Sequence, residues 1–151
     1  MEFFKIKKRK IGKNSPTFII AEIGLNHNGS LLLCKKLISE AKKCGADAVK
    51  LQIADSKYSY NTDTESYKIF KKNTLPFKDL RKVTSYAKRK KIILFATPGD
   101  FKSLEICKKL KFPAIKISSG LLTNEPLISK CAATKLPLIL STGMAFKNEI
   151  K

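Results

Sequence analysis

The chain of 151 residues is long enough to bury a sizeable hydrophobic core within one ordinary domain. No stretch reaches the roughly 18 consecutive apolar residues of a membrane span. The basic N-terminus has no apolar region of the kind that signal peptides carry. These features argue against a membrane or secreted protein, and we expect a protein of the cytoplasm.

The formal net charge of +19 comes almost entirely from lysine, since 28 of the 31 basic residues are Lys and three are Arg. Bidentate contacts to phosphates and base edges favour arginine, and the lysines are spread along the chain. The charge therefore favours a positive surface that attracts small anionic substrates. A basic nucleic-acid-binding protein is the less favoured alternative.

The four cysteines form no CxxC pair, and three of them fall in segments of helical pattern. This spacing indicates free thiols, buried or half-buried, rather than a disulfide or a metal site. They are Cys34, Cys44, Cys107 and Cys131.

The first predicted elements follow a basic N-terminal arm, which spans residues 1–16. Residues 17–24 (TFIIAEIG) form an apolar run that predicts a buried strand. A helix is expected from about Ser30, a suitable N-cap, to Lys43. Residues 47–53 (DAVKLQI) predict a second strand.

The segment from residue 54 to residue 77 is polar and irregular. Because it is long for a connecting loop, we expect it to be functional or to carry a short helix. The alternation of helices and strands then resumes. Helices are expected over residues 77–90, 101–110 and 125–134, and strands over residues 92–98, 114–120 and 137–143.

Five apolar strands that alternate with helices are typical of an α/β protein with a parallel sheet. No strand is followed by a GxGxxG or GxxxxGK[ST] motif. Nucleotide-binding Rossmann and P-loop proteins are therefore disfavoured.

Polar side chains lie at or near the carboxyl end of every predicted strand. Ligands bind at this end of the sheet in parallel α/β folds, so we expect these groups to gather at one site. A carboxylate, two ammonium groups, an amide and several hydroxyls together suit an anionic ligand that carries phosphate or carboxylate. The residues are Glu22, Lys50, Gln52, Thr97, Lys116, Ser118, Ser119, Ser141 and Thr142.

Simpler roles stay open for several of these residues. Glu22 can serve only as the ion-pair partner of a strand-end lysine, and each lysine can reach solvent along its own stem. The hydroxyls can cap the helices that follow. His27, the only histidine, precedes Asn28 and Gly29, which favour turns. A role in the turn into the first helix is therefore preferred over metal ligation.

Five stretches at these strand ends carry a resemblance to a known family. In chain order they are AEIGLNHNGS, GADAVKLQ, FATP, AIKISSGLLTN and PLILSTGM, and they spread over residues 17–146. Each is weak alone, but the collinear set resembles the N-acetylneuraminate (sialic acid) synthase family. That family also includes synthases for legionaminic and pseudaminic acid, which these motifs do not separate.

The resemblance implies a TIM-barrel catalytic domain that condenses phosphoenolpyruvate with an N-acylated amino-sugar, such as N-acetylmannosamine, and releases phosphate. It implies that Glu22 is the catalytic carboxylate and that Gln52 contacts the sugar. A divalent metal, Mn or Mg, would activate the open-chain sugar aldehyde. The residues that would cradle phosphoenolpyruvate are Lys50, Thr97, Lys116, Ser119 and Ser141.

Two positions depart from the pattern of that family. Leu121 follows SSG, where the family usually has an acidic residue that helps to bind the sugar. Gly99 follows the TP of the third strand, where an aromatic residue is common. Both departures concern the sugar more than the phosphate cradle.

A full barrel has eight strand-helix units and about 250 residues, whereas five predicted strands fall within residues 17–151. We therefore expect a partial TIM (β/α) barrel of about five parallel strand-helix units. The C-terminal half, the antifreeze-like domain and the family's two metal-binding histidines, which lie on later strands, would be absent. We expect no metal site here, because His27 does not match those histidines.

Such a chain would be a truncated product or a fragment that needs a complementary chain or a homo-oligomer. Its unclosed sheet would expose strand edges that a closed barrel removes. The alternative is an inactive remnant that binds a phosphorylated metabolite or a partner protein.

Overall fold

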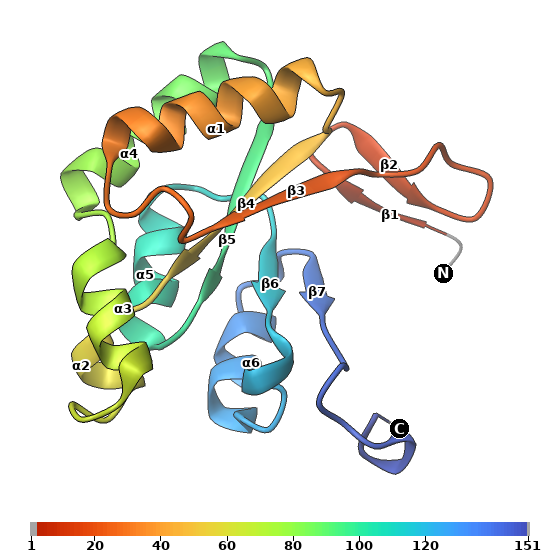
Figure 1. Ribbon diagram of the computed structural model, residues 1–151. Helices are drawn as coiled ribbons and strands as arrows, with labels where there is room; N and C mark the ends of the chain where they lie inside the picture. The colour runs from red at the N-terminus through yellow and green to blue at the C-terminus, as the bar shows by residue number, and fades with distance from the viewer. Residues whose placement is uncertain (1–2, 151) are drawn as a thin grey trace.

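The structure, a computed structural model, describes residues 3–150 of the chain. Its centre is a five-stranded parallel sheet whose strands keep their order in the sequence (Figure 1). The strands are β3 (Ile20–Gly24), β4 (Ala48–Ile53), β5 (Ile93–Pro98), β6 (Ile115–Ile117) and β7 (Leu138–Leu140). Parallel strands in sequential order, joined by helical crossovers, are the arrangement of a TIM barrel that has not closed. The predicted partial barrel is confirmed.

Four helices form the crossovers, and two short ones add to the connection between β4 and β5. The crossover helices are α1 (Leu31–Lys43), α4 (Phe77–Arg89), α5 (Phe101–Lys109) and α6 (Glu125–Ala132). The added helices are α2 (Ser56–Ser59) and α3 (Glu65–Asn73), and the 3-10 turns η1 (Ser119–Leu121) and η2 (Lys147–Glu149) follow β6 and β7. Within residues 3–150, every helix is too short or too polar to cross a lipid bilayer.

Side-chain caps fix where the helices begin. The Ser30 hydroxyl accepts a hydrogen bond from the Leu33 N–H at 3.2 Å, which confirms the predicted N-cap of α1. Asp100 caps α5 by accepting from the Ser103 N–H at 2.7 Å. Asn124 caps α6 in the same way. Three of the four crossover helices therefore begin at a polar cap, whereas α4 begins after Pro76, which makes no side-chain cap.

The hydrophobic core lies between the sheet and the crossover helices. β5 is its centre, because all six residues of this strand are buried and Phe95 is fully buried. A smaller cluster, which includes Leu104 and Leu127, packs between α5, α6 and β6. Three of the four free cysteines are buried in these clusters, as expected, whereas Cys44 is exposed.

β3 differs from the buried strand predicted for residues 17–24. It begins only at Ile20 and forms an edge of the five-stranded sheet, where β4 is its sole neighbour among the strands of residues 3–150. Ala21 is half-buried and Glu22 is exposed. A strand with one neighbour leaves part of its surface to solvent, so the apolar run overstated its burial.

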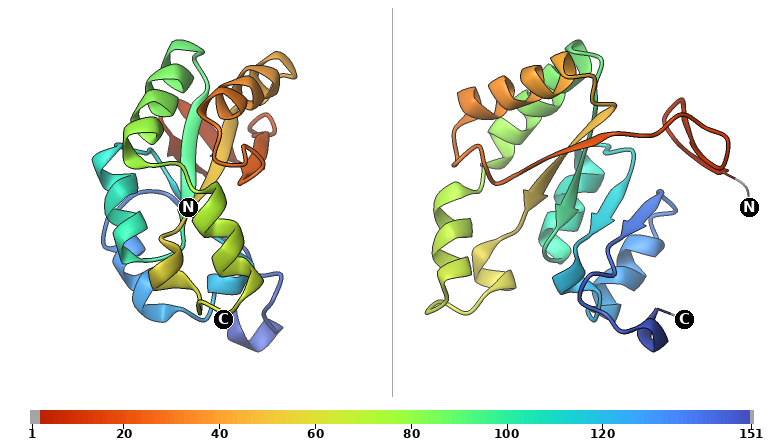
Figure 2. Two further views of the ribbon diagram at one scale, coloured as in Figure 1. Left: turned by 60° about the vertical axis from the view of Figure 1, so that its left-hand side comes forward. Right: turned by 45° about the vertical axis from the view of Figure 1, so that its right-hand side comes forward.

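The N-terminal arm, predicted only as basic over residues 1–16, contains a β-hairpin; its first two residues lie outside the described part of the chain. β1 (Phe3–Ile6) pairs antiparallel with β2 (Arg9–Gly12) at the amino-terminal end of β3 (Figure 2). Ile6 is fully buried in the core, and Arg9 forms an ion pair with Asp47 at 2.9 Å. Because lysines surround these short strands, their apolar pattern did not predict them.

Two crossover helices end on a lysine in the left-handed conformation. Lys91 follows α4 and Lys111 follows α5, each with φ of 54°, whereas Gly45 occupies the corresponding position after α1 with φ of 85°. Glycine is the residue that adopts this conformation without strain. We expect Lys111→Gly to raise the free energy of unfolding by about 0.5–1 kcal/mol, measured by urea denaturation.

The matched control is Lys109→Gly, which removes the same side chain from the last helical residue of α5. It is expected to lower the free energy of unfolding by up to about 1 kcal/mol, because glycine is a poor helix former. If Lys111→Gly lowers the free energy of unfolding as much as Lys109→Gly does, the left-handed conformation of Lys111 is not a source of strain.

Candidate functional site

The carboxyl ends of β3, β4 and β5 bring a carboxylate, an ammonium group and a hydroxyl into direct contact. Lys50 Nζ lies 2.6 Å from Glu22 Oε2 and donates a hydrogen bond to Thr97 Oγ1 at 3.3 Å. The strand register pairs Glu22 with Lys50 and Gln52 with Thr97. Because alternate residues of a strand share a face, these four residues lie on the same face of the sheet. We call them the strand-end cluster.

The two partners of the ion pair differ in exposure. The side chain of Lys50 is 6% exposed, whereas that of Glu22 is 58% exposed. A buried ammonium group needs a counter-charge and hydrogen-bond acceptors, because removing an isolated charge from water is very unfavourable. Glu22 and Thr97 supply both, and the exposed Glu22 carboxylate stays accessible to a ligand.

Gly24 allows the side chains of Glu22 and Gln52 to converge. Its φ of 54° lies in the left-handed region, which glycine adopts freely. A β-carbon here would lie 3.2 Å from Glu22 Oε1 and 3.4 Å from Gln52 Oε1. The register of β3 against β4 also shifts between Glu22 and Gly24, as at a bulge that re-aims a side chain.

Lys116 on β6 supplies a second ammonium group next to the strand-end cluster. Its Nζ donates a hydrogen bond to the carbonyl oxygen of Ile117 at 2.8 Å, and its side chain is half-buried. Burial and the positive charge of Lys50 lower the pKa of Lys116, and Glu22 partly opposes this shift. The site therefore has an excess of positive charge that a bound anion would relieve.

Ser119 and Ser141 lie at the same edge of the sheet, after β6 and β7. Ser119 begins η1, and the Ser141 N–H donates to the carbonyl oxygen of Ile117 at 3.0 Å. Both residues are half-buried. The predicted residues therefore lie at one end of the sheet. The two serines follow β6 and β7, the strands that are farthest from β3. Their roles in binding stay predictions.

His27 belongs to the turn between β3 and α1, as the sequence indicated. It is buried, and its Nδ1 accepts a hydrogen bond from the Gly29 N–H at 3.2 Å. Burial lowers the pKa of His27, which favours the neutral ring that such an acceptor requires. Asn28 and Gly29 both have positive φ, as expected of the turn.

The described residues do not fit the divalent metal that the resemblance implies. Within residues 3–150, no group of three or more His, Cys, Asp or Glu side chains could hold a metal ion. The carboxylate of the strand-end cluster, Glu22, is already paired with Lys50.

A pocket beside the strand-end cluster was not predicted. It has a volume of about 250 Å³, and its walls combine Gln52 and Thr97 with Tyr60 and Phe70 from the segment between β4 and α4. The unusual length of the segment was the one signal that pointed to a function there.

The fold and the strand-end cluster define the class of protein: a partial α/β barrel with charged side chains at the carboxyl ends of its strands. Comparison with known proteins then gives the family. The model of the NeuB family matches residues 37–151, and the chain belongs to this family.

Relatives and solved structures agree with this assignment. The chain is 46% identical over 150 residues to a protein of Methanocaldococcus jannaschii, covering 99% of this chain and 44% of that one. It is 37% identical to the N,N'-diacetyllegionaminic acid synthase of Legionella pneumophila, covering 93% and 43%. The N-acetylneuraminic acid synthetase of Leptospira borgpetersenii, solved with citrate, has a TM-score of 0.93 at 34% identity, covering 98% and 52%.

These comparisons confirm the resemblance to sialic acid synthases. The chain spans about half the length of the curated relatives it matches. Substrates and activity are therefore matters for proposal.

The electrostatics of Lys116 give a test that needs no ligand. Because the folded protein holds the pKa of Lys116 below its ordinary value, the charged form disfavours folding at neutral pH. We expect Lys116→Met to raise the free energy of unfolding by about 0.5–1 kcal/mol at pH 7. The gain in the free energy of unfolding should fade as the pH rises above the ordinary lysine pKa, because Lys116 is then neutral in both the folded and the unfolded state.

The control is Lys130→Met, which removes one charge from an exposed position on α6. It separates the local effect at Lys116 from the general relief of charge repulsion in a chain of net charge +19. Equal effects of the two variants would show that the environment of Lys116 is not special.

Proposed function

We propose that the chain provides the phosphoenolpyruvate-binding side of a synthase that joins phosphoenolpyruvate to an N-acylated amino-sugar, such as N-acetylmannosamine, and releases phosphate. The observation that carries this proposal is the buried Lys50 ammonium beside Lys116, with the Glu22 carboxylate 2.6 Å from Lys50. Membership of the NeuB family supports it. The names of the relatives, sialic and legionaminic acid synthases among them, support the class of product.

Lys50 and Lys116 would bind the anion. A phosphate and a carboxylate on one small ligand match two ammonium groups on neighbouring strands. Thr97 holds the Lys50 ammonium in place through the 3.3 Å hydrogen bond. The hydroxyls of Ser119 and Ser141 would complete the cradle from the ends of β6 and β7. Because these groups are ordered before the ligand arrives, they would stabilise the charge that shifts during reaction.

Glu22 would act on the acceptor side. In the proposed reaction C3 of phosphoenolpyruvate attacks the sugar aldehyde, water adds at C2, and phosphate leaves by cleavage of the C–O bond. The new alkoxide takes up a proton, and the attacking water gives one up. Glu22, which is accessible and close to the anion site, would move one of these protons or orient the sugar. Gln52 would contact the sugar.

A divalent ion, Mn²⁺ or Mg²⁺, would polarise the aldehyde oxygen in the reaction of the resembling family. We propose that its ligands come from outside residues 3–150, because the described residues form no suitable group. The steps assigned to Lys50, Lys116 and Glu22 do not pass through this ion.

Turnover would also require further strands. β3 and β7 are the two open edges of the five-stranded sheet, and a closed barrel has eight strands. We propose that a polypeptide carrying the remaining strand-helix units completes the site. The second candidate is an inactive protein that binds a phosphorylated metabolite through the same lysines. Phosphate release after addition of a family barrel's C-terminal half separates the two.

Calorimetric titration with phosphoenolpyruvate tests the anion site. We expect binding to the wild-type chain and a loss of roughly 10- to 100-fold in affinity for Lys50→Met, the range for removal of a charge-assisted contact. Lys130→Met, an exposed lysine on α6, should bind like wild type. Absence of both heat and a thermal shift on addition of phosphoenolpyruvate would refute the anion site.

A second substitution separates binding from chemistry. Glu22→Gln should leave phosphoenolpyruvate affinity within a few-fold of wild type, because the ligand meets the lysines. In the completed protein it should abolish phosphate release in the presence of N-acetylmannosamine and Mn²⁺. Substantial residual turnover would remove Glu22 from the catalytic machinery.

A further inference from the structure

The α2–α3 segment contributes almost nothing to the hydrophobic core. α3 has no buried residue, and the one buried residue of α2 is Ser56. Tyr60 and Phe70 are half-buried, and neither belongs to a cluster of the core. An ordered segment with two aromatic rings that do not serve the core needs another explanation.

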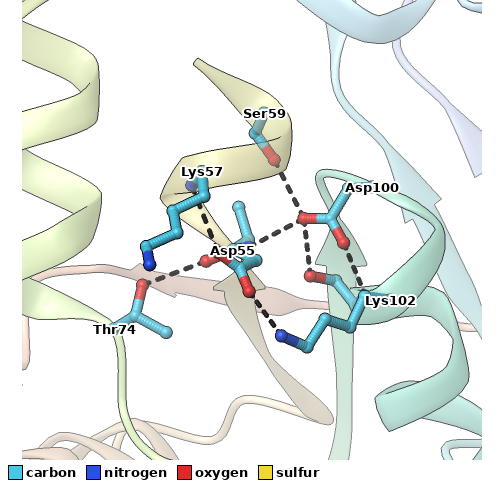
Figure 3. A network of polar contacts seen from close by, with 8 residues as sticks. Asp55, Lys57, Ser59, Thr74, Asp100 and Lys102 are labelled. Atoms are coloured by element: carbon cyan, nitrogen blue, oxygen red, sulfur yellow. Dashed lines mark hydrogen bonds and ion pairs between the residues drawn. The ribbon is translucent and has the colours of Figure 1, made fainter. Parts of the chain in front are cut away.

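Polar contacts rather than apolar packing hold this segment in place (Figure 3). Asp100 Oδ2 accepts hydrogen bonds from the Ser59 hydroxyl at 2.9 Å and the Asp55 N–H at 2.7 Å. Asp55 Oδ2 in turn pairs with Lys102 Nζ at 2.6 Å. Ser59 directly precedes Tyr60, so Asp100 ties the chain next to that ring to the end of β5.

The two rings face the pocket beside the strand-end cluster. Their centroids are 4.9 Å apart with an interplanar angle of 32°. Gly99 permits the close approach of the two loops, since a β-carbon there would lie 2.7 Å from Ala54 Cβ. The residues that line the pocket, all of them uncharged, include Gln52, Tyr60, Phe70, Thr97, Gly99 and Ser118.

None of these lining residues carries a charge, although the net charge of the whole chain is +19. Lys50 and Lys116 lie outside the lining, so an anionic group and a neutral group would bind side by side. At about 250 Å³ the pocket is smaller than the ~300–1,000 Å³ of a typical small-molecule site. It therefore suits one substituent of a ligand whose charged part is bound elsewhere.

We propose that Tyr60 and Phe70 are specificity-determining residues that bind the methyl group of the acceptor's N-acyl substituent. The aromatic faces would bury the methyl group. The Gln52 amide and the Ser118 hydroxyl line the same pocket and can hydrogen-bond the amide of the substituent. This inference rests on the proposed function, because it takes the acceptor to be an N-acylated amino-sugar.

The test compares two sugars that differ by one methyl group. N-acetylmannosamine and N-formylmannosamine are titrated into the 151-residue chain with saturating phosphoenolpyruvate, and affinities are measured from NMR chemical shifts. Burial of one methyl group predicts about a fourfold preference for the acetyl sugar. Tyr60→Ala and Phe70→Ala should each reduce this preference toward unity without changing the affinity for phosphoenolpyruvate.

Two variants serve as controls. Tyr60→Phe keeps the ring and should keep the preference. Phe101→Ala removes an exposed phenylalanine that does not line this pocket and should also keep it. Thermal unfolding of each variant separates loss of the ring from loss of the fold.

The possible outcomes are distinct. If phosphoenolpyruvate binds but neither sugar does, or the preference is absent or survives both alanine variants, the specificity role is overturned and the proposed anion site stands. If phosphoenolpyruvate itself does not bind, the proposed function fails, and the inference fails with it.

Discussion

The buried ammonium group of Lys50 is the constraint on which the arrangement of the strand ends depends. A charge at this depth requires a partner, and Glu22 and Thr97 are brought to it from the strands on either side of β4. The side-by-side register of β3, β4 and β5 is what makes this possible. Gly24 then leaves room for Gln52 next to the same carboxylate.

Around this cluster the protein separates two kinds of surface. Charged groups gather where β3, β4 and β6 end, while the neighbouring pocket is closed by the α2–α3 segment and has no charged lining. The segment is held by the carboxylate of Asp100, which also caps α5. Asp100 therefore both caps α5 and holds the α2–α3 segment, which forms one wall of the pocket.

The sequence pattern predicted what depends on local periodicity and failed where distant segments meet. The apolar runs predicted the strands that carry Glu22 and Lys50, since each strand's own residues decide this. The burial of Ile6 by the hairpin depends on contacts with the sheet, and short strands rich in lysine carry a weak signal. The Tyr60–Phe70 pair is also set by tertiary contacts, which local sequence patterns do not predict.

The open edges of the sheet connect the unusual charge of the chain to its behaviour in concentrated solution. β3 and β7 expose backbone groups that could pair with another copy, and Leu140 and Phe146 are exposed near β7. A net charge of +19 makes copies repel one another. That repulsion is screened beyond about 8 Å at physiological ionic strength. In a solution of residues 1–151, colloidal stability should therefore decline as salt is added.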